Sequence, residues 1–322
     1  MMVDKVTNKF FQIIFICFIL LFFSCSKADK IILYNQMFAT DSIPEAGIDS
    51  IGFLMRKHVI VVTVKDKNEI HVYNAMNGEF KKSIKRDNAF PNGITTINDQ
   101  FVLVTERDSK QVAVFNSSMD FLGTFGNSEL RSPYGITFYE QENNSYKVLV
   151  TDSYEYNNPR KDRILSWDFT IENEAFNVGP ATVLGDPTLY QVESIQSDKY
   201  YQTLLVAEEM KEHHKVMALD LVTGEVIKED LGNFDRGNDP EGIALVITKD
   251  NNGYWICTEQ SKTDNRFHLY DRKTLEYMST MYLDNVSYTD GIATAYMHGK
   301  WYLYAVDNDA RVVAFELPEI NS

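Results

Sequence analysis

Short runs of alternating or continuous hydrophobic residues dominate the chain from about residue 31 to its end. These runs are rich in β-branched and aromatic residues and are separated by Gly, Asn and Asp; they include HVIVVTV (58–64), QFVLVTE (100–106), KVLVTD (147–152), TLLVAEE (203–209) and YWICTE (254–259). Runs of this length and composition, with almost no helical period between them, predict β-strands. The pattern therefore predicts an all-β protein.

A Gly-Ile segment recurs ahead of these runs. It reads FPNGITTI at 90–97, SPYGITFY at 132–139, DPEGIALV at 239–246 and YTDGIATA at 288–295, and related segments begin at Gly47 and Val192. Successive units start 42 to 57 residues apart, and a repeat near that length with four strands per unit is typical of a β-propeller. We expect six four-stranded antiparallel blades between about residue 43 and the end of the chain.

The two ends of the chain are expected to close the ring together. The last unit has no room for its outer strand, because the chain stops soon after RVVAFEL (311–317). The run KIILYNQMF (30–38) precedes the first unit and has no partner there. We therefore predict that this N-terminal strand forms the missing edge of the last blade, which leaves only short, protected edges.

Within the repeated segment, two kinds of position have different expected roles. Gly tolerates close approach of a neighbouring backbone, so the repeated Gly is interpreted as blade architecture. The residue before it varies, being Asn92, Tyr134 and Glu241 in three of the copies. We expect these variable side chains to face one common opening, with Tyr134 the first to test by mutation.

The first residues carry an export pattern. Lys5 and Lys9 precede an apolar stretch from Phe10 to Phe23, which ends at Ser24 and Cys25. This is the charged, apolar and small-residue order of a secretory signal, and a Cys directly after it is typical of the lipidation site of bacterial lipoproteins. We predict a signal peptide at 1–24, a lipidated Cys25 with a tether at 25–29, and a propeller at 30–318. An ordinary signal peptide or a membrane anchor is the alternative.

Net charge limits the class of partner, and cysteine content limits how the fold is stabilised. The formal net charge is −15, which disfavours nucleic acid and anionic lipid and is compatible with cation binding. If Cys17 leaves with the signal and Cys25 carries lipid, only Cys257 remains, so the fold must be stable without an internal disulfide. We expect an exported monomer, in the periplasm or on the outer surface, that meets the membrane only through its lipid.

Acidic residues end the second strand of each predicted unit: Asp66, Glu106, Asp152, Glu208 with Glu209, Glu259 and Asp307. Equivalent strand ends lie on the same face of a propeller, so these carboxylates are expected to surround one opening. Carboxylates brought together repel unless cations lie between them, and such oxygen ligands suit Ca²⁺. The alternative is that they are solvated loop acids. Sequence motifs of Ser hydrolases, zinc proteases, P-loops and EF-hands are missing.

Taken in order, FPNGITTINDQFVLVTERDSKQVAVFN, SPYGITFY, LLVAEE, NDPEGIAL, GYWICTEQSKTDNRFHLYDR and TDGIATA make the chain similar to the β-propeller phytases over about residues 43–317. The resemblance implies a six-bladed phosphomonoester hydrolase that uses several Ca²⁺ ions to release phosphate from inositol phosphates by metal-activated water. It implies Glu208, Glu241 and Tyr134 as catalytic residues and Lys67 and Arg107 as phosphate-binding cations. The implied metal ligands are Glu208, Glu209, Asp239, Glu241, Asp290 and Asp307.

Two departures from the phytase pattern keep other functions open. Only Glu45 and Asp49 stand near the acidic segment that opens the first blade of the family, and Ser153-Tyr154 replaces a Lys-Glu pair. One alternative is a non-catalytic cell-envelope propeller that holds a cation, ligand or partner. Another is a lactonase-like propeller with a single axial metal, for which Asn92 and Glu241 are candidate ligands.

Overall fold

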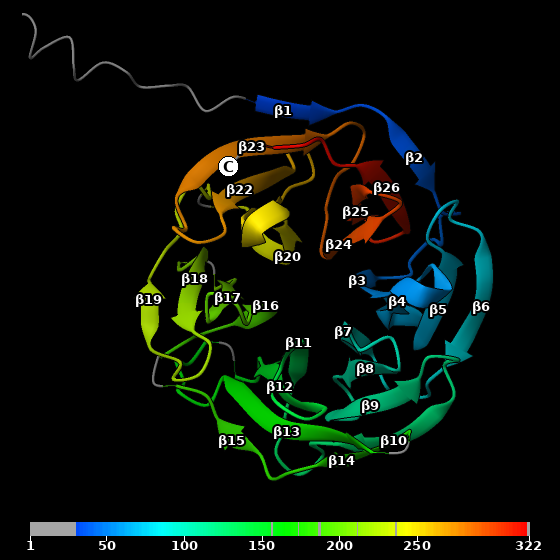
Figure 1. The fold of residues 1–322 in the computed structure, drawn as a ribbon, viewed down its shortest axis with the longest axis vertical. Helices are drawn as coiled ribbons and strands as arrows, with labels where there is room; N and C mark the ends of the chain where they lie inside the picture. The colour runs from blue at the N-terminus through cyan, green and yellow to red at the C-terminus, as the bar shows by residue number, and fades with distance from the viewer. Residues whose placement is uncertain are drawn as a thin grey trace, which may run out of the picture.

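The computed structural model describes residues 30–320, apart from Tyr156, Asn173, Asp186, Pro187, Lys211 and Arg236. Six β-sheets stand as blades around a central channel, with the first strand of each blade innermost (Figure 1). The prediction of an all-β, six-bladed propeller with four-stranded antiparallel blades is therefore confirmed. The helical segments of the described residues are the short 3-10 turns η1 (Met55–Lys57), η2 (Lys65–Lys67) and η3 (Lys249–Asn251).

The first three blades follow one another along the chain, each from its inner to its outer strand. Blade 1 contains β3 (Ile48–Leu54), β4 (Val59–Val64), β5 (Glu69–Asn74) and β6 (Phe80–Lys85); blade 2 contains β7 (Pro91–Ile97), β8 (Phe101–Glu106), β9 (Gln111–Asn116) and β10 (Phe121–Phe125); blade 3 contains β11 (Pro133–Glu140), β12 (Ser145–Asp152), β13 (Ile164–Glu172) and β14 (Ala175–Val178), with β15 (Thr182–Val183) also on β13.

The last three blades have the same order, and two of them include N-terminal strands. Blade 4 contains β16 (Val192–Asp198), β17 (Thr203–Glu208), β18 (Lys215–Asp220) and β19 (Val226–Lys228); blade 5 contains β20 (Asp239–Ile247), β21 (Gly253–Gln260), β22 (Arg266–Asp271), β23 (Tyr277–Leu283) and β1 (Lys30–Leu33); blade 6 contains β24 (Ile292–Met297), β25 (Lys300–Asp307), β26 (Arg311–Glu316) and β2 (Gln36–Ala39).

The N-terminal segment closes the ring, but across two blades and not one. Strand β2 pairs antiparallel with β26 and is the outer strand of blade 6, as expected. Strand β1 instead runs parallel to β23 and adds a fifth strand to blade 5 (Figure 1). A break at 34–35 separates the two strands. The segment predicted as one edge strand therefore covers the exposed edges of two neighbouring blades.

Hydrophobic packing lies between blades. Six clusters of buried side chains each join residues of two adjacent blades, for example blades 1 and 6 around Tyr304 and blades 2 and 3 around Trp167. A second strand such as β4 or β8 is buried along its whole length. Because neighbouring blades cover both faces of these strands, their sequences are continuous apolar runs without alternation.

Close contact between inner strands explains the repeated Gly. A Cβ atom at Gly135 would collide with the backbone carbonyl of Glu193 in the next blade, and one at Gly291 would collide with that of Asp49. A Thr of the second strand holds the same junction in three blades. In blade 1, Thr63 Oγ1 accepts from Ser50 N at 2.9 Å and donates to the carbonyl of Asn92 at 2.6 Å. The architectural interpretation of the Gly positions agrees with this packing.

Candidate functional site

One position of the repeat supplies most of a polar cluster at one end of the channel. It is the residue two places before the recurring Ile of each inner segment, and the cluster takes from it Asp49, Asn92, Tyr134, Glu193, Glu241 and Asp290. Inner strands begin at this end, so the same register places all six side chains on the same level of the ring. Three residues from second strands or the turns after them, Lys65, Glu209 and Gln260, complete the cluster.

On one side of the cluster, carboxylates surround an ammonium group. Lys65 Nζ lies 2.9 Å from Asp49 Oδ2 and 3.0 Å from Asp290 Oδ2. Asp49 Oδ2 also accepts from Tyr134 Oη at 3.0 Å and from Asn92 Nδ2 at 3.3 Å. Burial alone would raise the pKa of Asp49, but the Lys65 charge and the hydrogen-bond donors outweigh it and lower that pKa. Asp49 is therefore a charged and fully partnered carboxylate.

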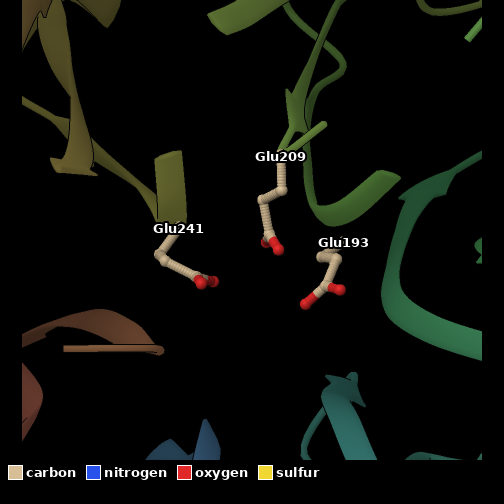
Figure 2. A group of neighbouring side chains, drawn as sticks. All are labelled: Glu193, Glu209 and Glu241. Atoms are coloured by element: carbon tan, nitrogen blue, oxygen red, sulfur yellow. The ribbon is translucent and has the colours of Figure 1, made fainter. Parts of the chain in front are cut away.

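On the other side, three glutamates face one another, and none of them forms an ion pair with a basic side chain in the described part of the chain. Glu193 on β16, Glu209 just after β17 and Glu241 on β20 point their carboxylates inward (Figure 2). One oxygen of each lies within 4.8 Å of the others, and this is the only group of its kind among the described residues. Gln191 Nε2 donates to Glu193 at 2.7 Å and to Glu209 at 3.1 Å.

The pKa values of these glutamates shift in the direction opposite to that of Asp49. Burial, and after it the charges of Glu193 and Glu241, raises the pKa of Glu209 well above its usual range. Burial and the nearby Asp290 do the same for Glu241, and burial raises the pKa of Glu193. Glu209 Oε1 is buried and has no hydrogen-bond partner among the described residues. Such a group must be neutralised, either by shared protons or by a bound cation.

Two further groups complete the chemistry of the cluster. Burial raises the pKa of Asp290 to about 7, and its carboxylate also accepts from Gln260 Nε2. Burial, followed by the charges of Asp49 and Glu193, raises the pKa of Tyr134 well above its usual value. Tyr134 is therefore a hydrogen-bond donor at neutral pH, whereas Asp290 is able to exchange a proton there.

Four of the residues implied as site residues come together in this cluster: Tyr134, Glu209, Glu241 and Asp290. Three implied metal ligands lie elsewhere. Glu208 accepts from the backbone N–H of Tyr190 at 2.6 Å, Asp307 from Arg311 Nε at 2.7 Å, and Asp239 lies 3.2 Å from His214 Nε2. Cys25 lies outside the described residues.

The two implied phosphate-binding cations also lie outside the cluster. The guanidinium of Arg107 stacks on the ring of Phe90, 4.0 Å from its centroid. Lys67 is part of the same 3-10 turn as Lys65, but Lys65 is the residue that reaches the channel. Lys65 directly follows the buried strand β4, so the turn begins with a side chain directed inward and not with an exposed one.

The acids at the ends of second strands do not form a ring around the opening. Glu106, Asp152, Glu208, Glu259 and Asp307 are buried in separate blades, each with donors of its own. Glu106, for example, accepts from Arg86 Nε at 2.6 Å and from Gln111 Nε2 at 2.7 Å. Each of these side chains points into the edge of its own blade. In blade 1 the equivalent strand-end position is Val64, and Asp66 lies beyond it in the following turn. The channel carboxylates come mainly from inner strands.

The sequence-based prediction did not include Lys65, Glu193 and Gln260 as site residues, and it considered Asp49 only as a substitute for the acids that open the first phytase blade. Asn92 was expected to share one opening with Tyr134 and Glu241 and to be a candidate ligand of an axial metal, and it lies in the cluster. A signal for most of the cluster is present in the repeat. Aligning the Ile of each inner segment, and not its Gly, would have placed Asp49 and Glu193 beside Tyr134 and Glu241, because Ser50 and Ser194 replace Gly in those blades. Lys65 and Gln260 have no such signal.

Directly below the polar cluster, Gly, Ser and Ile residues form the channel wall, and the cavity that they line is also lined by charged residues such as Asp198, Lys199 and Arg272. A cavity of about 710 Å³ extends from the Gly and Ser residues that follow the cluster positions toward the opposite face. One Ile from every blade lines it: Ile51, Ile94, Ile136, Ile195, Ile243 and Ile292. The polar cluster therefore lies at one end of a channel whose walls offer no charge at the next level.

Comparison with known proteins supports the fold more than the family. No protein-family model matches the sequence, and no curated protein matches it. Among solved structures, the chain is similar to a gluconolactonase from Xanthomonas campestris, with a TM-score of 0.62, 10% identity, and coverage of 88% of this chain and 89% of that one. It is also similar to regucalcin from Agrobacterium tumefaciens, described as a calcium-binding protein, with a TM-score of 0.57, 10% identity, and coverage of 90% and 96%.

These likenesses show that the chain shares the propeller fold of a lactonase and of a calcium-binding protein. The phytase resemblance receives no support from them. The described residues also contain no helix that is both long and apolar enough to span a membrane. The export signal and lipid anchor remain predictions.

Proposed function

We propose that the protein is a lactonase-like hydrolase that binds one divalent cation through Glu193, Glu209 and Glu241. The observation that carries this proposal is the convergence within 4.8 Å of three carboxylates, those of the buried Glu193 and Glu241 and of the half-buried Glu209. Their raised pKa values and the unpartnered Oε1 of Glu209 indicate a missing positive charge. Three hard oxygen donors suit Ca²⁺, which takes further oxygens from water or substrate. The calcium-binding propeller among the similar structures supports this choice of ion.

The neighbouring residues fit ester hydrolysis at such a centre. A divalent cation held by the three glutamates would act as a Lewis acid toward a carbonyl oxygen and lower the pKa of a bound water. Asp290, with a pKa of about 7, is the candidate general base. Tyr134 and Lys65 remain protonated and fix Asp49 between them. A ring ester is favoured over a phosphomonoester because the one ammonium group of the described cluster, that of Lys65, is already paired with Asp49 and Asp290 and does not serve an anionic substrate.

The test measures ion binding and turnover separately. Calorimetric titration of metal-free protein with Ca²⁺ should show one site, which Glu209→Gln removes. Glu212→Gln, at an exposed position of the same turn, is the matched control and should retain it. Purified protein with Ca²⁺ should then hydrolyse members of a panel of sugar and aliphatic lactones but not inositol hexakisphosphate.

Each of the other possible results would indicate a different function. Phosphate release from inositol hexakisphosphate would restore the phytase hypothesis. Calcium binding without turnover of any ester would identify a non-catalytic binding propeller. Folded wild-type protein that binds no Ca²⁺, Mg²⁺ or Mn²⁺ would overturn the proposal. For the envelope location, metabolic labelling with a fatty acid should depend on Cys25 and be lost in Cys25→Ser.

A further inference from the structure

The ammonium of Lys65 lies between carboxylate oxygens of two adjacent blades. Its nearest oxygens are Asp49 Oδ2 on blade 1, at 2.9 Å, and Asp290 Oδ2 just before blade 6, at 3.0 Å. The Lys65 side chain is only 17% exposed. The carboxylates around it outweigh the effect of burial and raise the pKa of Lys65. The ammonium is thus a permanent charge and neither a nucleophile nor a base.

The groups around Lys65 resemble the ligand set of a metal ion more than an ordinary surface ion pair. Asp49 and Asp290 are buried, and Asn92 is fully buried. Asn92 Nδ2 donates to Asp49 Oδ2 at 3.3 Å, but its Oδ1 has no hydrogen-bond partner among the described residues. A buried amide oxygen without a donor costs free energy unless a cation or water satisfies it. Carboxylate and amide oxygens are the donors that Ca²⁺ takes from proteins.

We propose that Asp49 and Asp290, with Asn92 beside them, form a second cation site, in which the Lys65 ammonium pairs with the two carboxylates in place of an ion and leaves Asn92 Oδ1 without a partner. This proposal does not depend on the function proposed above, because it concerns a different set of oxygens. The two sites lie side by side, since Tyr134 donates to Asp49 and its hydroxyl is close enough to Glu193 for the charges of both to act on it. The consequence rests on the function proposed above: with an ion on the three glutamates, Lys65 limits the cluster to one exchangeable divalent cation.

The physical reason for such a substitution is charge density. Asp49, Glu193, Glu241 and Asp290 are buried at one end of the channel beside the half-buried Glu209, and burial removes much of the water that would screen them. A tethered ammonium costs no binding entropy at the moment of use and cannot dissociate. It neutralises one half of the cluster at any ion concentration and leaves the other half responsive to a divalent cation.

A factorial set of variants tests the proposal. Calorimetric titration with Ca²⁺ is performed on wild type, Lys65→Ala, Glu209→Gln and the double variant. Lys65→Ala should bind one more Ca²⁺ than wild type, and the double variant should bind one more than Glu209→Gln. Lys110→Ala removes an exposed lysine from the corresponding turn of blade 2 and should leave the number of sites unchanged. Lys65→Met, which fills the space with an apolar chain, should add no site.

Thermal melting of the same variants provides a second measurement. Without Ca²⁺, Lys65→Ala and Lys65→Met should both melt below wild type, because Asp49 and Asp290 lose their counterion. Millimolar Ca²⁺ should restore the melting temperature of Lys65→Ala but not of Lys65→Met, also when each is combined with Glu209→Gln. Absence of an added site in Lys65→Ala, or a loss of folding that Ca²⁺ does not restore, would overturn the proposal. A wild type without a site, combined with a gain in Lys65→Ala, would contradict only the proposed function.

Discussion

Two sets of buried carboxylates lie in this propeller, and they differ in what surrounds them. Those at the ends of second strands each have dedicated donors; Glu259, for example, pairs with His268 at 2.6 Å and with Asn238. Those of Glu193, Glu209 and Glu241 mainly face one another. Both sets are acidic and, apart from the half-buried Glu209, buried. The difference teaches that burial of an acid becomes evidence for a ligand only where the protein supplies too few partners of its own.

The largest expected effect comes from breaking a partnered carboxylate. Glu259→Ala should lower the free energy of unfolding by about 3–5 kcal/mol, because it leaves buried polar partners unpaired. His268 is 2% exposed and loses the acceptor of its Nε2. Urea unfolding followed by fluorescence measures this loss. A change below about 1 kcal/mol would show that water replaces the carboxylate easily, and the contrast between the two sets would fail.

Calcium should act on the other set alone. At a free concentration 100-fold above its dissociation constant, Ca²⁺ should raise the free energy of unfolding by about 2.7 kcal/mol. Glu209→Gln should remove this increase, while Glu259→Gln, which leaves the three channel glutamates in place, should retain it in folded protein. Differential scanning fluorimetry at several concentrations of Ca²⁺ measures both. An equal response of the two variants would place the ion elsewhere.

The pH dependence of stability should report on Asp290 and Asp309, two acids near Lys65 that belong to neither set. Burial raises the pKa of Asp290 to about 7 and that of Asp309 to about 6, so the native state binds more protons than the unfolded state above pH 4. Stability without divalent cations should therefore fall as pH rises from about 4 to 7, by up to about 1.4 kcal/mol per pH unit for each group. Denaturant titrations at pH 5 and pH 7.5 measure this, and Asp290→Asn should reduce the slope. A rise in stability over this range would contradict it.

The smallest effect is expected at an acid outside both sets. The Asp239 side chain is 47% exposed and lies 3.2 Å from His214. Asp239→Asn should change stability by no more than about 0.5 kcal/mol and should leave the calcium affinity within twofold. The same calorimetric titration measures it. A larger loss of affinity would return Asp239 to the ligand set that the phytase resemblance implies.

The sequence by itself determined the architecture. Apolar runs with a repeat of 42 to 57 residues predict the number of blades, because each blade must bury both faces of its second strand against its neighbours. The repeated Gly is also visible in the sequence, and its physical reason is that adjacent inner strands come too close for a Cβ at Gly135 or Gly291. Even the ring closure by β2 follows from a missing strand at the end of the chain.

Only the tertiary structure decided which polar residues meet. Glu208 and Glu209 are adjacent in sequence, yet one points into the blade edge and the other into the channel, because successive side chains of a strand alternate. Lys65 and Lys67 lie in one turn, and only Lys65 reaches Asp49 and Asp290. Such choices depend on the direction of a side chain and on partners up to 225 positions away. A repeat fixes the level of a residue in the ring, but the turns and the neighbouring blades determine its partners.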